Sequence, residues 1–320
     1  MRKIVITPRG FAACGEDCIE RMERCGFSVD YNDTGKAYTA AQFYEHCRDA
    51  EGLIVGVERV DREFIDSCPK LRAVVKFGVG TDNIDLAYCR DKGIYTGRCA
   101  GCNSRSVAEL ALAFALAETK NLYNSLHDTR SGAWNKYMGY EVLGKTFGIV
   151  GFGAVGKALA QMANGLGMHV LAYDAFEIGQ ECAEQFNVTI SDLDTIYRTS
   201  DFISLHVPLT KETENMITLE EMKKMKRGCV LINTARGGIV SEKDLYRALA
   251  EKIIRAAYFD VFTSEPPERD EPLLTLENFY LSPHIASRAV EAEKNTCRIS
   301  TDVILAALGG RQETGPGNGA

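Results

Sequence analysis

The sequence predicts an α/β protein built from two doubly wound parallel-sheet domains. Short apolar runs alternate with helical segments along nearly all of the 320 residues. A glycine-rich turn, Gly151 to Gly156, joins one of these apolar runs to a helical segment. Polar residues follow several other apolar runs, at the points where parallel strands would end. A chain of this length is long enough to bury two separate cores.

The first part of the chain, up to about residue 99, alternates between predicted strands and predicted helices at short intervals. We expect strands at 3–6, 27–31, 52–56 and 71–77, and helices at 15–25 and 40–48. The strand that ends near Lys76 is followed by Gly78 and Gly80, whose N–H groups could form an anion-binding concavity at the strand end. An ordinary structural turn explains these glycines about equally well.

The chain is expected to cross into the second domain near residues 99–106, and Val107 to Ala117 then predicts a long alanine-rich helix. A helix that is apolar nearly all round needs cover on more than one side, which a partner subunit can supply. We therefore expect a homodimer formed through the 100–140 segment. The alternative is a core helix buried within a monomer.

The stretch from Leu143 to Asp174 reads as strand, glycine turn, helix and strand. Three glycines at this spacing permit a tight turn, a close approach to a pyrophosphate and close packing of the helix on the strand. The helix N-terminus can then hold the anion. Asp174 ends the second strand, where its carboxylate can accept hydrogen bonds from a ribose, and Ala175 and Phe176 follow instead of a cation. These features favour NAD over NADP as the cofactor. They also favour a dinucleotide-binding turn over a glycine turn of another kind.

Beyond Asp174 we expect strands at 200–208, 229–238, 256–262 and 279–286, and a helix at 288–308, with a disordered tail after Gly309. Arg236, Glu265 and His284 all fall at the carboxyl-terminal ends of these strands. An arginine can hold a carboxylate and polarise a carbonyl, a histidine can carry a proton at neutral pH, and a glutamate can orient that histidine. Each residue alone has an ordinary structural explanation, but their arrival after a dinucleotide turn favours catalysis.

Bulk properties exclude several classes of protein. The net charge of −7 comes without a basic stripe, which argues against nucleic-acid partners. The longest apolar run, 110–117, is too short to span a membrane, so we expect a cytoplasmic protein. The eleven cysteines fit reduced thiols, and no metal site is predicted. Cys99 and Cys102 have redox or metal spacing, but two small residues in a hinge are the simpler interpretation.

Taken together, four motifs resemble the D-isomer-specific 2-hydroxyacid dehydrogenases, and most closely their short, phosphoglycerate-dehydrogenase-like members. The motifs are Gly151-Phe-Gly-Ala-Val-Gly with Asp174, Asn233-Thr-Ala-Arg-Gly, Asp260-Val-Phe with Glu265-Pro, and Ser282-Pro-His-Ile-Ala. The resemblance covers nearly the whole chain. It implies an NAD-binding Rossmann domain, residues 100–285, inserted into a flavodoxin-like catalytic and substrate-binding domain formed by residues 1–99 and 286–320.

The resemblance also implies roles for residues at matching positions. Arg236, Glu265 and His284 match the family's catalytic residues, and Lys76, Val79, Gly80 and Arg236 match its substrate-binding positions. The expected NAD-binding residues are Gly151, Gly153, Ala154, Val155, Gly156, Asp174, His206, Val207, Pro208, Thr213, Thr234, Ala235, Arg236, Asp260, His284 and Ala286. Among these, Asp260 is expected at the nicotinamide carboxamide.

The implied activity is NAD-dependent interconversion of a small, anionic D-2-hydroxy acid and its 2-keto acid. Two departures bear on the substrate. Gly56, Val57 and Glu58 stand where phosphoglycerate dehydrogenases commonly place an arginine, and Lys76 stands where they carry a second one. Phosphoglycerate is therefore disfavoured. The alternatives are 3-phosphoglycerate dehydrogenase proper, a glyoxylate or hydroxypyruvate reductase, a phosphite-type dehydrogenase, and an NADH-sensing, corepressor-like binding protein.

Overall fold

The computed structural model describes residues 2–309 and divides into two compact units. Unit 1 takes in the chain up to Asn103 and again from Arg288, and unit 2 is Ser104–Ser287. These junctions lie four and two residues beyond the expected ones at 99–100 and 285–286. The tail expected to be disordered after Gly309 lies outside the described residues.

Unit 1 is built on a five-stranded parallel sheet with the order β2-β1-β3-β4-β5. Its strands are β1 (Arg2–Ile6), β2 (Phe27–Tyr31), β3 (Gly52–Val55), β4 (Ala73–Lys76) and β5 (Tyr95–Arg98). This is the flavodoxin-like order. The chain places β2 on one side of β1 and then adds β3, β4 and β5 on the other side, so the strand order reverses between β1 and β3. The predicted fold class is thus confirmed for this unit.

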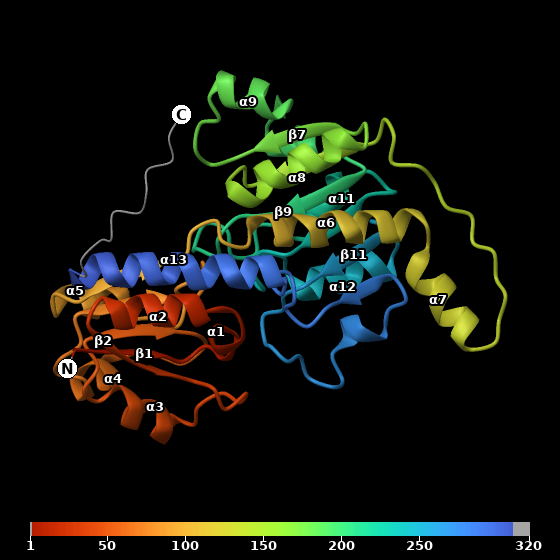
Figure 1. Cartoon of the computed structure of the whole chain (residues 1–320). Helices are drawn as coiled ribbons and strands as arrows, with labels where there is room; N and C mark the ends of the chain where they lie inside the picture. Colours follow the sequence, from red (N-terminus) through yellow and green to blue (C-terminus); the bar gives the residue numbers. More distant parts are fainter. Residues whose placement is uncertain (1, 310–320) are drawn as a thin grey trace. The chain divides into compact units, whose positions relative to one another are not determined.

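Helices cover both faces of that sheet, as Figure 1 shows. Along β1, Ile4 and Ile6 pack with Phe11 and Met22 on one face, while Val5 joins Phe43 in the core of the other. Successive side chains of a strand point to opposite faces, so an uninterrupted apolar strand serves two cores. The helices are α1 (Arg9–Cys14), α2 (Glu16–Arg24) and α13 (Val290–Leu308) on the first face, and α3 (Ala40–Cys47), α4 (Arg62–Ser67) and α5 (Leu86–Asp91) on the second.

Unit 2 contains a seven-stranded parallel sheet with the order β12-β11-β10-β9-β6-β7-β8. Its strands are β6 (Thr146–Val150), β7 (His169–Tyr173), β8 (Thr189–Ile190), β9 (Phe202–Leu205), β10 (Val230–Asn233), β11 (Ala256–Phe259) and β12 (Phe279–Leu281). From β6 the chain first builds outward through β7 and β8, and then returns to the other side at β9. The point of reversal between β6 and β9 is where ligands of such sheets bind.

The two faces of this sheet carry separate cores. Phe147 and Ile149 pack with α6 (Ser104–Thr119) and α8 (Ala154–Gly165), and α9 (Gln180–Phe186) contacts the same core. Val150 and Leu205 face the opposite core, with α10 (Leu193–Thr199), α11 (Leu219–Lys224), α12 (Glu242–Ala250) and the 3-10 helix η1 (Pro272–Thr275). Both domains are therefore doubly wound, as predicted.

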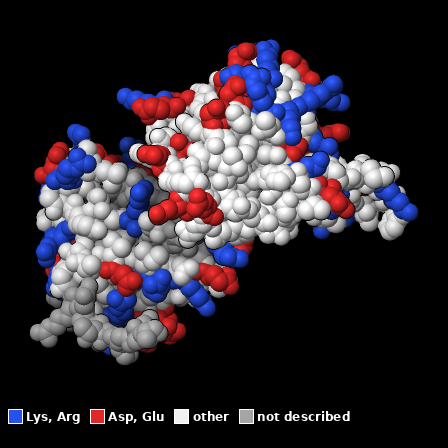
Figure 2. Space-filling view, turned by 90° about the horizontal axis from the view of Figure 1, so that it is seen from above, with Lys and Arg blue, Asp and Glu red and all other residues white. Residues whose placement is uncertain are grey.

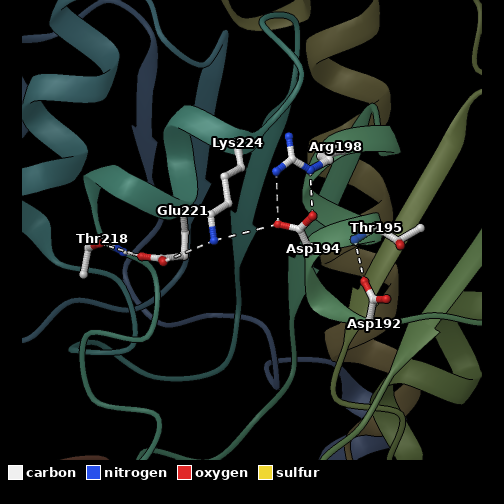
Figure 3. A network of polar contacts seen from close by, with 7 residues as sticks. All are labelled: Asp192, Asp194, Thr195, Arg198, Thr218, Glu221 and Lys224. Atoms are coloured by element: carbon white, nitrogen blue, oxygen red, sulfur yellow. Dashed lines mark hydrogen bonds and ion pairs between the residues drawn. The ribbon is translucent and has the colours of Figure 1, made fainter.

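Surface ion pairs join two of these helices. Asp194 on α10 pairs with Arg198 at 2.6 Å and with Lys224 of α11 at 3.8 Å (Figure 3). Figure 3 also shows Asp192 accepting from the Thr195 N–H and Thr218 paired with Glu221, which are the N-terminal caps of α10 and α11. Exposed pairs of this kind contribute little individually, so the apolar core supplies most of the stability.

Several predicted strands of this sheet were too long. The expected strand at 200–208 ends at Leu205 in the structure, because its neighbours β6 and β10 end at the paired residues Val150 and Asn233. The ladder has no partner beyond that point, and the chain turns away. His206 to Pro208 therefore lie past the sheet edge, where ligands of such sheets bind. The expected strands at 229–238, 256–262 and 279–286 likewise end early, at Asn233, Phe259 and Leu281.

An arm with several exposed apolar side chains extends from unit 2 after α6. The helix α7 (Leu122–Arg130) has no buried residue, and the chain after it projects from the body of the unit (Figure 1). The face seen in Figure 2 mixes acidic and basic side chains. Within residues 2–309, no helix combines the length and apolar character that crossing a membrane requires.

Candidate active site

The glycine turn follows β6 at the point of chain reversal. Gly151 has φ 99°, a conformation that side-chain-bearing residues rarely adopt, and a Cβ there would lie 2.6 Å from the carbonyl carbon of His206. Gly156 lies buried in the first turn of α8, where a Cβ would overlap the carbonyl oxygen of Gly151. The two glycines thus let the turn, the helix and the β9 segment pack at backbone distance.

The N-terminus of α8 is open to a ligand. The N-cap is Gly153, no side chain caps the helix and its first turn contains no acidic residue. A Cβ on Gly153 would meet no atom within 4 Å, so the space in front of the backbone is clear. Uncapped N–H groups at the positive end of a helix dipole form a site for a phosphate. These features fit the pyrophosphate of a dinucleotide.

Asp174 lies at the end of β7 and contacts the glycine turn directly. One of its carboxylate oxygens accepts a hydrogen bond from the Phe152 N–H at 2.6 Å, and the other accepts from the Phe176 N–H at 3.0 Å. These bonds fix the carboxylate beside the turn. An acceptor held at the end of the second strand fits the ribose hydroxyls of a bound NAD.

The segment after β9 forms a second wall. His206 shares a hydrogen bond of 2.9 Å with Ser204 through its Nε2, and burial lowers its pKa to about 3, so the imidazole stays neutral at physiological pH. Thr213 donates to the Pro208 carbonyl at 2.6 Å, which closes the 208–213 loop directly after Val207. This wall is therefore fixed by hydrogen bonds, and His206 adds no charge to it.

The segment after β10 carries Arg236. The buried Asn233 side chain accepts from the Ala235 N–H at 3.0 Å and donates to the Arg236 carbonyl at 2.9 Å, which holds this segment in a tight turn. The Arg236 guanidinium donates to the Ala235 carbonyl at 2.7 Å. The Thr234 hydroxyl is buried and has no hydrogen-bond partner within residues 2–309. A buried polar group of this kind needs a partner, and a bound cofactor can supply one.

His284 and Glu265 form a pair. The Nδ1 atom of His284 lies 2.7 Å from the Glu265 Oε2, and the Oε1 of the same carboxylate accepts from the Phe262 N–H at 3.0 Å. The backbone of His284 is left-handed, with φ 53°, and both side chains reach the surface, 51% and 38% exposed. A carboxylate on Nδ1 fixes the orientation of the ring and leaves Nε2 as the group that can exchange a proton.

The buried Asp260 holds the segment that carries His284. It accepts hydrogen bonds from the Ile285 and Ala286 N–H groups at 2.9 and 2.8 Å, and also from the Ser282 hydroxyl. All three donors flank His284 in the chain. Sequence reasoning missed this role, for which the only available signal was an acidic residue directly after an apolar strand. The predicted contact of Asp260 with a nicotinamide carboxamide stays a prediction.

Three neighbouring strands thus present the three predicted catalytic residues. Arg236 follows β10, Glu265 follows β11 and His284 follows β12, and these strands are adjacent and parallel. Their carboxyl ends therefore lie at one edge of the sheet. The structure brings Glu265 and His284 into contact. The meeting of Arg236 with this pair remains a prediction.

The predicted substrate residues of unit 1 lie at the end of β4, which is Lys76, and in the loop after it. The Lys76 ammonium donates to the Gly56 carbonyl at 2.5 Å and to the Asn83 side-chain oxygen at 2.7 Å. Val79 and Gly80 lie in the half-buried loop that follows. These bonds tie Lys76 to the end of β3, where an arginine was noted as absent. Cys99 is buried beside this loop, and its thiol donates to the Lys76 carbonyl.

The fold and the strand-end residues of unit 2 define an NAD-binding Rossmann domain. Residues 112–286 match the sequence model of a protein family described as D-isomer specific 2-hydroxyacid dehydrogenase, NAD binding domain. The chain belongs to the D-isomer specific 2-hydroxyacid dehydrogenase family.

Similar proteins agree with this assignment. The chain is 36% identical over 299 residues to D-3-phosphoglycerate dehydrogenase of Methanocaldococcus jannaschii, covering 92% of this chain and 56% of that protein. It is 38% identical over 301 residues to glyoxylate reductase of Thermococcus litoralis, covering 91% and 90%. The crystal structure of TT0316 protein from Thermus thermophilus superposes with a TM-score of 0.85 at 29% identity, covering 99% of each chain. The chain thus spans little more than half of the phosphoglycerate dehydrogenase and nearly all of the glyoxylate reductase.

Proposed function

We propose that this protein is an NAD-dependent dehydrogenase that interconverts a small D-2-hydroxy acid and its 2-keto acid. The observation that carries the proposal is the 2.7 Å contact between His284 and Glu265, at the same sheet edge as a dinucleotide-binding turn. A proton carrier beside a hydride carrier is what the interconversion of an alcohol and a carbonyl requires.

Each residue then has one task. Arg236 binds the substrate carboxylate and polarises the neighbouring carbonyl. His284 gives a proton to the carbonyl oxygen during reduction and takes one from the hydroxyl during oxidation, while Glu265 orients the imidazole through Nδ1. When bound, NAD supplies the hydride acceptor or donor. Asp174 and the open end of α8 would hold its ribose and pyrophosphate, and the buried Thr234 hydroxyl would gain a partner.

We propose glyoxylate or hydroxypyruvate as the keto acid. Among similar proteins, those named glyoxylate reductase and hydroxypyruvate reductase align over 81% or more of their own length. Glu58 follows β3 where phosphoglycerate dehydrogenases commonly carry an arginine, and its carboxylate accepts from the Thr7 hydroxyl at 2.6 Å. An anionic side chain in that place disfavours a phosphorylated substrate. Lys76, Val79 and Gly80 remain our predicted substrate residues in unit 1.

The test is NADH oxidation with glyoxylate, hydroxypyruvate, pyruvate and 3-phosphohydroxypyruvate. We expect turnover, with the phosphorylated acid poorest. His284→Ala should lower kcat by about 10²- to 10⁴-fold, the usual worth of a positioned proton carrier. The matched control is His169→Ala, which removes an exposed imidazole at the start of β7. An unchanged rate in His284→Ala would remove the proposed proton carrier. NADH binding without turnover of any keto acid would favour a binding protein.

We further propose that the protein is a cytoplasmic homodimer that pairs through the 100–140 segment. The support is the exposure of large apolar side chains on α7 and the chain after it, including Leu126 at 51%, Trp134 at 78% and Met138 at 91%. An apolar surface of this kind indicates an interaction site. Light scattering of the purified protein should give twice the mass of one chain, and Leu126→Asp should shift it toward one. All eleven cysteines are free, which suits a reducing compartment.

A further inference from the structure

Glu242 is a half-buried carboxylate outside the predicted catalytic and NAD-binding residues. It lies in the first turn of α12, at the end of the segment that begins with Arg236. Its Oε1 accepts a hydrogen bond from the Thr263 N–H at 2.8 Å, across 21 residues of sequence. Thr263 lies in the loop between β11 and Glu265. The bond therefore connects two of the three segments that carry the predicted catalytic residues.

A second contact holds the same two segments together. Gly237 follows Arg236 directly, and a Cβ added at Gly237 would overlap the carbonyl group of Phe262. The backbones of the two segments thus pack with no side chain between them. The glycine and the Glu242 carboxylate meet neighbouring residues of one loop, Phe262 and Thr263. Contacts at two adjacent residues fix both the position and the direction of this loop.

The loop held in this way carries the carboxylate that contacts the proposed proton carrier. The Phe262 N–H donates to the Glu265 Oε1 at 3.0 Å, and the Glu265 Oε2 lies 2.7 Å from the His284 Nδ1. A series of contacts therefore runs from Glu242 through this loop to His284. Because the Glu265 and His284 side chains are 38% and 51% exposed, hydrogen bonds rather than burial must hold them in place.

We propose that Glu242 is a positioning residue for catalysis, which holds the Glu265 loop against the Arg236 segment. The inference rests on the proposed function, in which Glu265 orients His284. Without the Glu242 carboxylate the loop is free to shift, and the imidazole loses the fixed direction in which its Nε2 exchanges a proton. A displacement of about 1 Å at a reacting group can lower a rate roughly 100-fold. The proposed pyrophosphate and ribose sites at α8 and β7 take no part in these contacts.

Kinetics of NADH oxidation with hydroxypyruvate, together with amide hydrogen exchange followed by NMR, test the proposal. Glu242→Ala should lower kcat about 10- to 100-fold and speed exchange at the Phe262 N–H, because the Glu265 carboxylate is no longer held against it. Affinity for ADP-ribose should not change. Glu242→Gln should recover most of the rate, since its amide oxygen can still accept from Thr263 in a bond about half as strong. Asp244→Ala, which removes the other carboxylate in the first turn of α12, is the control and should match wild type.

A double-mutant cycle with Glu265→Ala separates positioning from a general structural role. Because Glu242 acts through Glu265, Glu242→Ala should lower kcat no further in that background, whereas two independent losses would multiply. Unchanged exchange at Phe262, a kcat within about twofold of wild type in Glu242→Ala, or multiplying losses would each overturn the proposal. Equal losses in Asp244→Ala would assign the effect to the stability of α12 instead. A wild type that turns over no keto acid, with faster Phe262 exchange in Glu242→Ala, would sink the proposed reaction but support the contact from Glu242 to the Glu265 loop.

Discussion

Replacing Asp260 by asparagine should damage both stability and catalysis, because one buried carboxylate holds the segment around His284. One oxygen accepts from the Ser282 hydroxyl and the Ile285 N–H, and the other accepts from the Ala286 N–H at 2.8 Å. An asparagine keeps one acceptor and places an NH₂ group where the other was. If the amide oxygen takes the first place, the NH₂ faces the Ala286 N–H, and one charge-assisted bond is lost.

A bond to a charged group is worth about 1.5–3 kcal/mol, so the loss in free energy of unfolding should be about 2–3 kcal/mol. Displacing His284 by about 1 Å should also cost roughly 100-fold in kcat. Urea unfolding gives the first quantity, and NADH oxidation at saturating keto acid gives the second. Asp270→Asn removes an exposed carboxylate in the same unit and should change neither.

The measured pattern distinguishes two roles for Asp260. If it only contacts the cofactor, Asp260→Asn should raise the Kd for NADH and leave the free energy of unfolding unchanged. If it positions His284 as argued, unfolding and kcat should change together. The reasoning would be refuted if the variant's free energy of unfolding lay within about 0.5 kcal/mol of wild type and its kcat within twofold. A loss of stability smaller than about 0.5 kcal/mol is typical of a neutral surface change.

Two further predictions follow from the site. Gly156→Ala should weaken NADH binding and lower the melting temperature, because the added Cβ overlaps the Gly151 carbonyl. The control Gly165→Ala lies in the same helix with open space around it and should be neutral or stabilising. Equal behaviour of the two variants would contradict the packing argument. Burial lowers the pKa of His206 to about 3 from about 6.5 unfolded. Its stability contribution should be complete above pH 6.5 and be lost as the pH falls toward 3, by up to about 1.4 kcal/mol per pH unit. Urea unfolding from about pH 7.5 to about pH 5.5 should show a slope that His206→Gln lacks; identical slopes would refute it.

The sequence predicted those parts of the fold that depend on local pattern. The strand at 27–31 was placed at its observed ends, and the glycine turn was found with Asp174 because their spacing along the chain reflects one strand, turn, helix and strand unit. The helix α1 was missed, since its six residues begin directly after Pro8 and carry no side-chain cap to mark the start.

Features that depend on contacts between distant segments could not be predicted in the same way. Asp260 meets the Ile285 and Ala286 N–H groups only because β11 and β12 are neighbours in the sheet. The buried Thr234 hydroxyl is recognisable only when the surrounding atoms are in place. The end of β9 at Leu205 is likewise set by the ends of its partner strands rather than by its own residues.

The central claim is that hydride and proton transfer occur at the edge formed by β10, β11 and β12. The most direct measurement incubates the protein with NADH and hydroxypyruvate and determines both the NADH consumed and the configuration of the hydroxy acid formed. The account predicts one NADH oxidised per acid formed and a single D product, both abolished in His284→Ala. Formation of the L acid, or equal formation of product by the variant, would contradict it.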